Sequence, residues 1–184
     1  MHKSLDDIRS EVAAINADAR RLCAGLAEEQ LGWRPQPGKW SIAESLAHLN
    51  VTTQTYLPAI QRSLDQARAK GMTGSGSFDL GITGKWFVSY LEPPFKMKTK
   101  APKMIQPLLQ GSATEALPQF LRCNEVFLKH VDAAEGVDLG SAVFISPFAS
   151  ILRMKLIAAF ATVTSHDRRH LWISAKIREQ IDKR

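Results

Sequence analysis

The chain has 184 residues, 45% of them hydrophobic and 23% charged, which is ordinary for a globular protein and predicts a single domain over residues 1–184. Its net charge of +6 comes without a zinc-finger, RNP-like or helix-turn-helix pattern, so we expect no specific nucleic-acid partner. No apolar run of about 18 residues predicts a membrane span, no apolar signal segment is present, and two cysteines, Cys23 and Cys123, indicate reduced thiols in a cytoplasmic protein.

The first predicted helix covers about residues 4–27. Apolar residues recur there at gaps of three and four, which is the period of one helical face. This face consists of Leu5, Ile8, Val12, Ile15, Ala19 and Leu22. Two prolines and a glycine then make residues 33–38 irregular.

A second helix is predicted to begin at Ser41. Ser41 and Glu44 have the S-x-x-E spacing of a capping box, in which each side chain satisfies a free backbone N–H of the first turn. Pro58 cannot donate a backbone hydrogen bond, so we expect the helix to kink or end near Leu57.

Residues 71–110 show no clear helical period and are predicted to form a long connection. Gly76 and Gly81 have the glycine spacing of a phosphate-binding loop, but Ile82 stands where lysine is required, which excludes a P-loop. Residues 86–91 are too apolar to be fully exposed, so the connection should fold back over the bundle. Its lysines are expected in a solvated loop, with phosphate or membrane contact as the alternative. They are Lys96, Lys98, Lys100 and Lys103.

Two more helices complete the predicted fold. A helical period over residues 117–131, with Pro118 near its start, indicates the third, and residues from about 148 to 181 indicate the last. No segment alternates with period two for long enough to predict a sheet. Four helices with one long crossover between the second and third predict an all-α four-helix bundle.

The last helix carries two histidines within its apolar stripe. Gaps of three, four, three and four separate Val163, His166, His170, Ile173 and Ile177. Four residues advance a helix by about 6 Å and just over one turn, so two imidazoles can converge on one ion at about 2.0–2.1 Å. A shared metal would also avoid burying imidazoles without partners. Two unrelated core or edge histidines are the alternative.

The residues between these histidines argue against a metalloprotease. Its H-E-x-x-H signature needs glutamate after the first histidine, where this chain has Asp167, so a general-base role is unsupported. Arg168 and Arg169 are expected to be solvated or paired, with an anionic ligand at the site mouth as the alternative.

His48 is the candidate third ligand. It lies on a largely polar face of the second helix, which suits a residue lining a wet internal pocket but also an exposed histidine. Glu44, one turn earlier, could orient its ring, although its role as the capping partner of Ser41 is the simpler interpretation. His2 and His130 have no such context and are expected at the surface.

Two segments together resemble the DinB/YfiT-like superfamily. Residues 38–49, GKWSIAESLAHL, resemble the opening of the family's second helix, and residues 166–171, HDRRHL, look like its H-x-x-x-H-L motif. The resemblance spans nearly the whole chain. It implies an up-down-down-up four-helix bundle, often dimeric, in which His48, His166 and His170 bind nickel, zinc or a similar ion. Relatives often have glutamine soon after the H-L pair, where this chain has Trp172 and Ile173.

Three protein ligands would leave an open coordination position, which is typical of catalytic sites. Superfamily members that resemble this chain include thiol-dependent S-transferases, so we expect a divalent transition metal, a low-molecular-weight thiol and a small-molecule substrate. Zinc or nickel is expected, although three imidazoles also accept copper or iron. Hydrolysis ranks lower because no dedicated carboxylate base is evident. The competing functions outside enzymology are a non-catalytic metal-binding stress protein and a basic nucleic-acid-binding protein.

Overall fold

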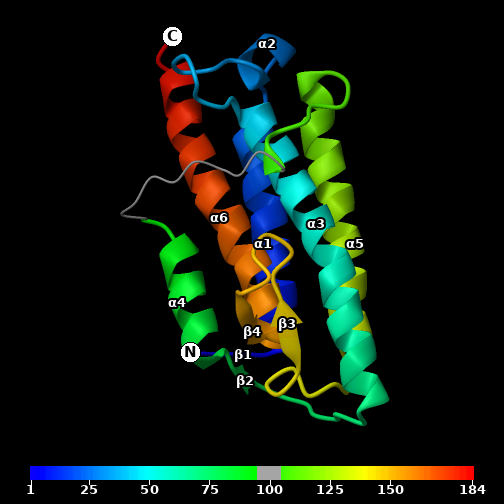
Figure 1. Cartoon of the computed structure of the whole chain (residues 1–184). Helices are drawn as coiled ribbons and strands as arrows, with labels where there is room; N and C mark the ends of the chain where they lie inside the picture. Colours follow the sequence, from blue (N-terminus) through cyan, green and yellow to red (C-terminus); the bar gives the residue numbers. More distant parts are fainter. Residues whose placement is uncertain (95–104) are drawn as a thin grey trace.

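The computed structural model describes residues 1–94 and 105–184. Its long helices are α1 (Leu5–Cys23), α3 (Ile42–Ala69), α5 (Ala116–Ala133) and α6 (Leu156–Ile181). Helix α3 packs against α5 and α1 against α6, while further contacts join α3 to α6 and α1 to α5. In Figure 1, α1 and α6 run toward the end of the molecule that holds the C-terminus, and α3 and α5 run away from it. The prediction of a mainly helical fold is confirmed.

Shorter elements connect these helices. They are the helices α2 (Glu28–Leu31) and α4 (Gly81–Leu91), the 3-10 turn η2 (Ala113–Glu115), and the strands β1 (His2–Lys3), β2 (Phe78–Asp79), β3 (Val143–Ile145) and β4 (Arg153–Lys155). Strand β1 pairs with β2 and β3 with β4, both antiparallel. The sequence showed no alternation long enough to predict a sheet, and these ladders of two or three residues are too short for a period of two to be recognised.

Helix α3 begins as predicted and continues further than predicted. Glu44 N–H donates to Ser41 Oγ (3.1 Å) and Ser41 N–H donates to Glu44 Oε2 (2.9 Å), which confirms the capping box. Pro58 lies inside the helix, so of the two predicted outcomes, a kink or an end near Leu57, the end was wrong. Its ring is exposed while Leu57 and Ile60 are buried. Tertiary packing on both sides therefore outweighs the local cost of proline.

Replacing Pro58 with alanine should stabilise the protein by about 1 to 2 kcal/mol. The substitution restores a backbone donor in the helix, and the gain stays below the full cost of an interior proline of about 3 kcal/mol because proline also restricts the unfolded chain. Urea unfolding followed by helical circular dichroism measures the difference. A lower unfolding midpoint would show that the helix needs proline at this position.

Helix α6 begins at Leu156, later than the predicted start near residue 148. The residues that suggested an earlier start include Phe148 and Leu152, which lie between β3 and β4 and pack against the core. Phe148 also contacts the ring of Tyr56. Their apolar spacing therefore belongs to a hairpin that covers the bundle and not to a helix.

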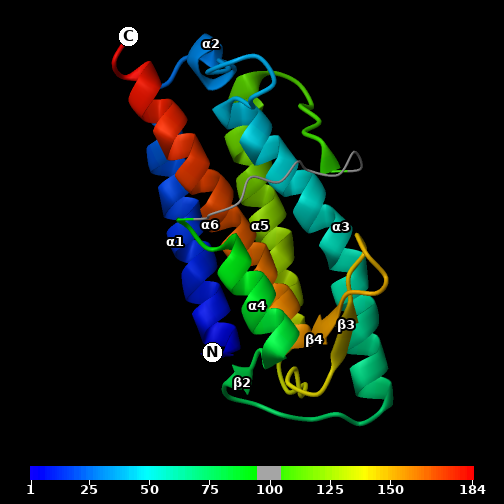
Figure 2. The same ribbon diagram turned by 60° about the vertical axis from the view of Figure 1, so that its left-hand side comes forward.

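The connection between α3 and α5 contains α4, which packs along α6 (Figure 2). The position of α4 confirms that the connection folds back over the bundle, although the sequence showed no clear helical period there and α4 was not predicted. Gly84 allows the close approach, because a Cβ on Gly84 would overlap the Cβ of Ala158. The four lysines predicted to form a solvated loop lie within residues 95–104, outside the described residues.

A polar layer divides the apolar core at the middle of the bundle. One cluster includes Ile8, Phe127 and Phe160, and the other includes Ile15, Phe120 and Leu171. Between them each long helix contributes polar side chains, namely Asn16 on α1, His48 and Asn50 on α3, Asn124 on α5, and His166, Asp167 and His170 on α6. Polar groups in a core are typical of functional sites. Among the described residues, no helix is long and apolar enough to cross a bilayer.

Candidate metal centre

The structure brings His48, His166 and His170 together. His48 comes from α3 and the other two from α6, and one nitrogen of each ring lies within 4.8 Å of the others. The ring centroids are 5.1 Å apart for His48 and His166, 4.6 Å for His48 and His170, and 4.7 Å for His166 and His170. The sequence prediction of one cluster from these three residues agrees with this arrangement.

The distances within the cluster suit a metal ion. Nε2 of His48 lies 3.4 Å from Nε2 of His166. Two nitrogens at about 2.1 Å from a tetrahedral ion are separated by about 3.4 Å, so this pair needs no rearrangement. The cluster could therefore hold a metal ion, and three ligands would leave one position open.

Burial keeps these imidazoles neutral. It lowers the pKa of His48 and lowers the pKa of His166 to about 3, with the nearby charges of His48 and Arg169 as smaller causes. The pKa of His170 is well below its ordinary value for the same first reason. Neutral imidazole is the form that binds a metal, so all three rings are ready to act as ligands at neutral pH.

The crossover fixes the orientation of the His48 ring. Nδ1 of His48 lies 2.5 Å from the backbone carbonyl oxygen of Ile105. Since a carbonyl only accepts, Nδ1 carries the proton and donates it, which leaves the lone pair on Nε2 facing His166. Metal-binding histidines commonly have such a partner on their second nitrogen. No sequence signal marks this contact, because any residue offers the same carbonyl.

Trp40 forms one wall of the cluster. Its ring lies 4.6 Å from the His48 ring and is stacked 5.9 Å from the His170 ring, measured between centroids. The indole therefore restrains histidines from both helices and limits water access on that side. The sequence analysis included Trp40 only as part of the family motif. Its position directly before Ser41, the N-cap of α3, was the sequence signal that could have placed it near the start of the helix that carries His48.

Glu44 does not orient His48. Its carboxylate accepts from Ser41 N–H and is paired with Arg34, whose Nε donates to Oε2 at 2.8 Å. Burial alone would raise the pKa of Glu44, but the hydrogen bonds from Arg34 and Ser41 and the charge of Arg34 together outweigh burial, and the pKa is lowered. The simpler interpretation of Glu44, as a capping residue, is confirmed.

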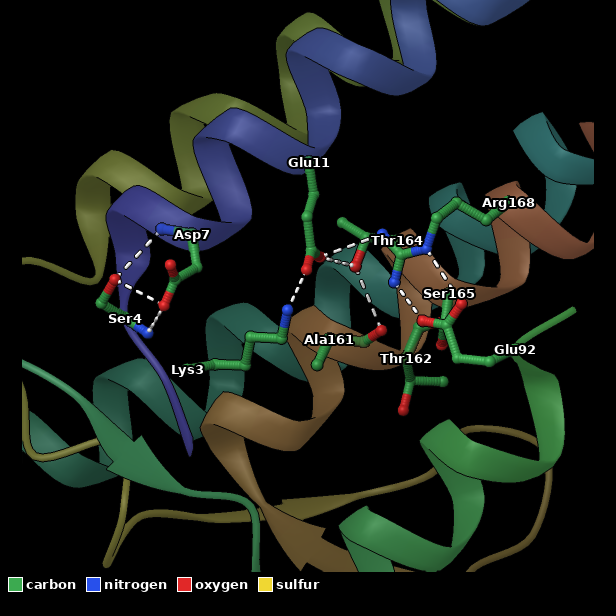
Figure 3. Close-up of polar contacts among 10 residues, drawn as sticks. All are labelled: Lys3, Ser4, Asp7, Glu11, Glu92, Ala161, Thr162, Thr164, Ser165 and Arg168. Atoms are coloured by element: carbon green, nitrogen blue, oxygen red, sulfur yellow. Dashed lines mark hydrogen bonds and ion pairs between the residues drawn. The ribbon is translucent and has the colours of Figure 1, made fainter. Parts of the chain in front are cut away.

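Arg168 is paired within a network that links α6, α1, β1 and the end of α4 (Figure 3). Its Nη1 lies 3.2 Å from Glu11 Oε2 and its Nε donates to Glu92 Oε2 at 3.1 Å. Glu11 also pairs with Lys3 and accepts from Thr164 Oγ1 at 2.6 Å. Because Glu92 follows α4 directly, this network ties the end of α4 to the helix turn that carries the histidines.

Arg169 is buried and binds the same segment. It donates to the carbonyl oxygen of Tyr90 at 3.1 Å, and its guanidinium lies 5.4 Å from the centre of the Tyr90 ring. The expectation that Arg168 and Arg169 are paired is confirmed. Arg169 also places a positive charge beside the histidines, since it contributes to the lowered pKa of His166 and His170.

Replacing Glu11 with glutamine should destabilise the protein at pH 7 and reduce its sensitivity to acid. Burial alone would raise the pKa of Glu11, but the hydrogen bonds from Lys3 and Thr164 and the charge of Arg168 outweigh burial and lower it. A lowered pKa stabilises the fold above the unfolded-state pKa, and this contribution is lost as pH falls through the folded-state pKa. We expect a loss of about 1 to 2 kcal/mol at pH 7 and a smaller difference near pH 3, measured by urea unfolding. An equal difference at both pH values would contradict the role of the ionised carboxylate.

Asp167 lies inside the bundle, with 1% of its surface exposed. Burial raises its pKa well above the ordinary value, and the charge of Arg168 opposes this only in part. A carboxyl group that is closed to bulk solvent is poorly placed to act as a general base. This agrees with the expectation that the residue after the first histidine does not play the metalloprotease role.

The other candidates lie away from the cluster. His2 is in β1, and His130 Nδ1 contacts the Val126 carbonyl on α5 at 2.9 Å. Cys23 and Cys123 are free and buried. Burial raises the pKa of Cys23 to about 11 and that of Cys123 to about 12, so neither thiol is an activated nucleophile.

Comparison with known proteins agrees with the histidine motifs. A search of curated proteins and a search of solved structures each gave no match. The family model of the DinB superfamily matches residues 12–174, a range that contains all three histidines. The chain therefore belongs to the DinB superfamily.

Proposed function

We propose that this protein is a metal-dependent enzyme that holds one divalent transition ion, zinc or nickel, through His48, His166 and His170. The observation that carries the proposal is the cluster itself, in which three neutral imidazoles converge and leave one coordination position open. A cluster built only for stability would more often be closed by a fourth protein ligand.

The reaction that we infer is transfer of a low-molecular-weight thiol to a small electrophilic substrate. A bound ion would lower the pKa of a coordinated thiol, so that its sulfur is present as thiolate. The chain favours an anionic group at this place because the charge of Arg169 lies beside the histidines. Trp40 and the buried Ile105 limit the access of water.

Hydrolysis has less support from the same residues. It needs a carboxylate or imidazole that can take a proton from water. Asp167 is buried with a raised pKa, and Glu44 is engaged by Ser41 and Arg34. The three histidines are assigned to the ion, so a thiol, which loses its proton more readily than water does, suits this site better than water.

A screen of metal-loaded and metal-free protein with several low-molecular-weight thiols and electrophiles tests the proposal. We expect turnover that requires both the metal and one thiol, and that is lost in His48→Ala. Tight metal binding without turnover for any thiol would instead favour a non-catalytic metal-binding stress protein. In that case His48→Ala should lower the melting temperature of the metal-loaded protein without abolishing a reaction.

The proposal includes the location, binding partners and oligomeric state of the enzyme. We infer a cytoplasmic protein whose partner is a small molecule and neither nucleic acid nor a membrane, with the homodimer that the family resemblance implies. The expected up-down-down-up connectivity is supported by the directions of the four long helices in Figure 1.

A further inference from the structure

Four buried polar atoms lack a hydrogen-bond partner within residues 1–94 and 105–184. They are Asn50 Oδ1, Asp167 Oδ1, His170 Nδ1 and Ser174 Oγ. A buried polar group without a partner costs about 1–3 kcal/mol, and such groups are rare in native structures unless a water or ion serves them. Four of them in one domain therefore require an explanation.

These atoms belong to one region of the bundle. Asp167, His170 and Ser174 are spaced by three and four along α6, so they share one face of that helix. Asn50 is on α3, two residues after His48. The Cys123 thiol lies 3.9 Å from the backbone oxygen of Asn50, and the carboxyl of Asp167 is close enough to raise the pKa of the same thiol. Asn50 and Asp167 thus both lie near Cys123, and Asp167 shares its helix face with His170 and Ser174.

His48 and His170 differ in the hydrogen bonding of the ring nitrogen that does not face the cluster. His48 donates its second ring nitrogen to the Ile105 carbonyl, whereas Nδ1 of His170 has no protein partner in the described chain. A metal-binding histidine almost always donates this N–H to a carboxylate, a carbonyl or a water. The nearby groups do not bond to His170 directly, but they offer two acceptor oxygens, on Asn50 and Asp167, and the hydroxyl of Ser174.

We propose that buried water fills this region and connects His170 Nδ1–H to Asp167 Oδ1 on one side and to Ser174 Oγ on the other, with Asn50 Oδ1 as a further acceptor. Seven residues of helix separate Asp167 from Ser174 by about 10 Å, and a single water bridges only about 6 Å, so at least two waters are needed. The inference rests on the proposed metal site, because it makes Asp167 and Ser174 positioning residues for a metal-binding ring.

The chemistry of each group fits this assignment. The waters accept from His170 Nδ1–H and from the Ser174 hydroxyl, and they donate to the oxygens of Asp167 and Asn50. Oδ1 of Asp167 accepts whether or not the carboxyl is ionised, so the arrangement does not depend on its titration. With Nδ1 protonated and held, Nε2 of His170 presents its lone pair to the ion, as Nε2 of His48 does.

A matched pair of serine variants tests the proposal. Ser165 is also fully buried on α6, but its hydroxyl already donates to the Thr162 carbonyl at 3.1 Å. Ser174→Ala should weaken zinc binding about 10-fold, as loss of an outer partner typically does, while Ser165→Ala leaves it unchanged. Asp167→Leu should weaken zinc binding as well, and Asp167→Asn, which keeps an oxygen at the same place, should restore it.

Stability gives a second, independent result. If Ser174 holds a water, Ser174→Ala should melt below wild type, as Ser165→Ala should after losing its hydrogen bond to Thr162. If the Ser174 hydroxyl has no partner at all, Ser174→Ala should instead melt above wild type, because removing an unsatisfied group stabilises a protein. That outcome would overturn the inference even if a variant at Asp167 failed to fold.

A high-resolution crystal structure of the zinc-loaded protein and ring ¹⁵N NMR complete the test. We expect ordered water beside Asp167 and Ser174 and a protonated Nδ1 on His170. Zinc bound to Nδ1 of His170, or a dry face beside it, would overturn the inference while the metal site stands. Failure of the wild-type protein to take up any metal would defeat the proposed function and the positioning role with it.

Discussion

Replacing His166 with alanine should reduce the metal content of the purified protein from about one ion per chain to almost none. His166 approaches both other ligands, with its Nε2 3.4 Å from that of His48 and its ring 4.7 Å from that of His170. Its loss leaves two imidazoles from different helices, which hold a divalent ion far more weakly than three. Elemental analysis of wild type and variant, purified side by side, measures the effect.

The matched control for this experiment is His130→Ala, a histidine on α5 whose Nδ1 contacts the Val126 carbonyl of the same helix. This variant should keep the metal content of the wild type. Circular dichroism should show equal helix content for all three proteins, so that loss of metal is not mistaken for loss of fold. Equal metal content in wild type and His166→Ala would disprove the three-histidine site.

Replacing Gly84 with leucine should destabilise the protein by about 3 kcal/mol, at the upper end for an overpacked contact. Even a Cβ at this position would overlap the Cβ of Ala158, so α4 must move away from α6. On helix propensity alone the substitution should stabilise α4 by nearly 1 kcal/mol, because glycine is a poor helix former. The sign of the measured change therefore shows whether the close packing of α4 on α6 controls stability.

The neighbouring substitution Thr83→Leu is the control for Gly84→Leu. Thr83 is exposed on the same helix, so leucine there changes helix propensity without meeting α6. Urea unfolding should give a small change for Thr83→Leu and a large loss for Gly84→Leu. Because α4 ends at the residues that bind Arg168 and Arg169, we also expect Gly84→Leu to bind metal more weakly. A Gly84→Leu protein as stable as wild type would contradict the packing of α4.

The sequence predicted the parts of this protein that depend on helical periodicity. The gaps of three and four around His166 and His170 correctly placed both rings toward the interior, because a long amphipathic helix has one possible buried face. The S-x-x-E spacing likewise gave the start of α3 at Ser41 correctly. His48 lies on a face with both polar and apolar residues, so the helical period could not decide whether its ring is buried or exposed. The family resemblance supplied the prediction that it is a ligand.

Other features depend on contacts that are distant in sequence and leave no local pattern. Helix α3 continues through Pro58 because buried residues on both sides of it pack against the bundle. These tertiary contacts cannot be read from the local sequence. The strand pairs and the Ile105 carbonyl next to His48 are backbone contacts that many side chains would allow. Asp167 and Ser174 did carry a signal, since their spacing from His170 places them on its helix face, but polar residues on a mostly apolar helix are easily assigned to its surface.

The cluster joins parts of the chain that are far apart, since 118 residues separate His48 from His166. An ion that binds only the folded chain adds about 2.7 kcal/mol to its stability when free metal is 100-fold above the dissociation constant. Native proteins are stable by only about 5–15 kcal/mol, so this gain would reduce the unfolded fraction about 100-fold. Degradation in the cell acts on that fraction. The amount of this protein would therefore follow the supply of its metal, even when no substrate is present.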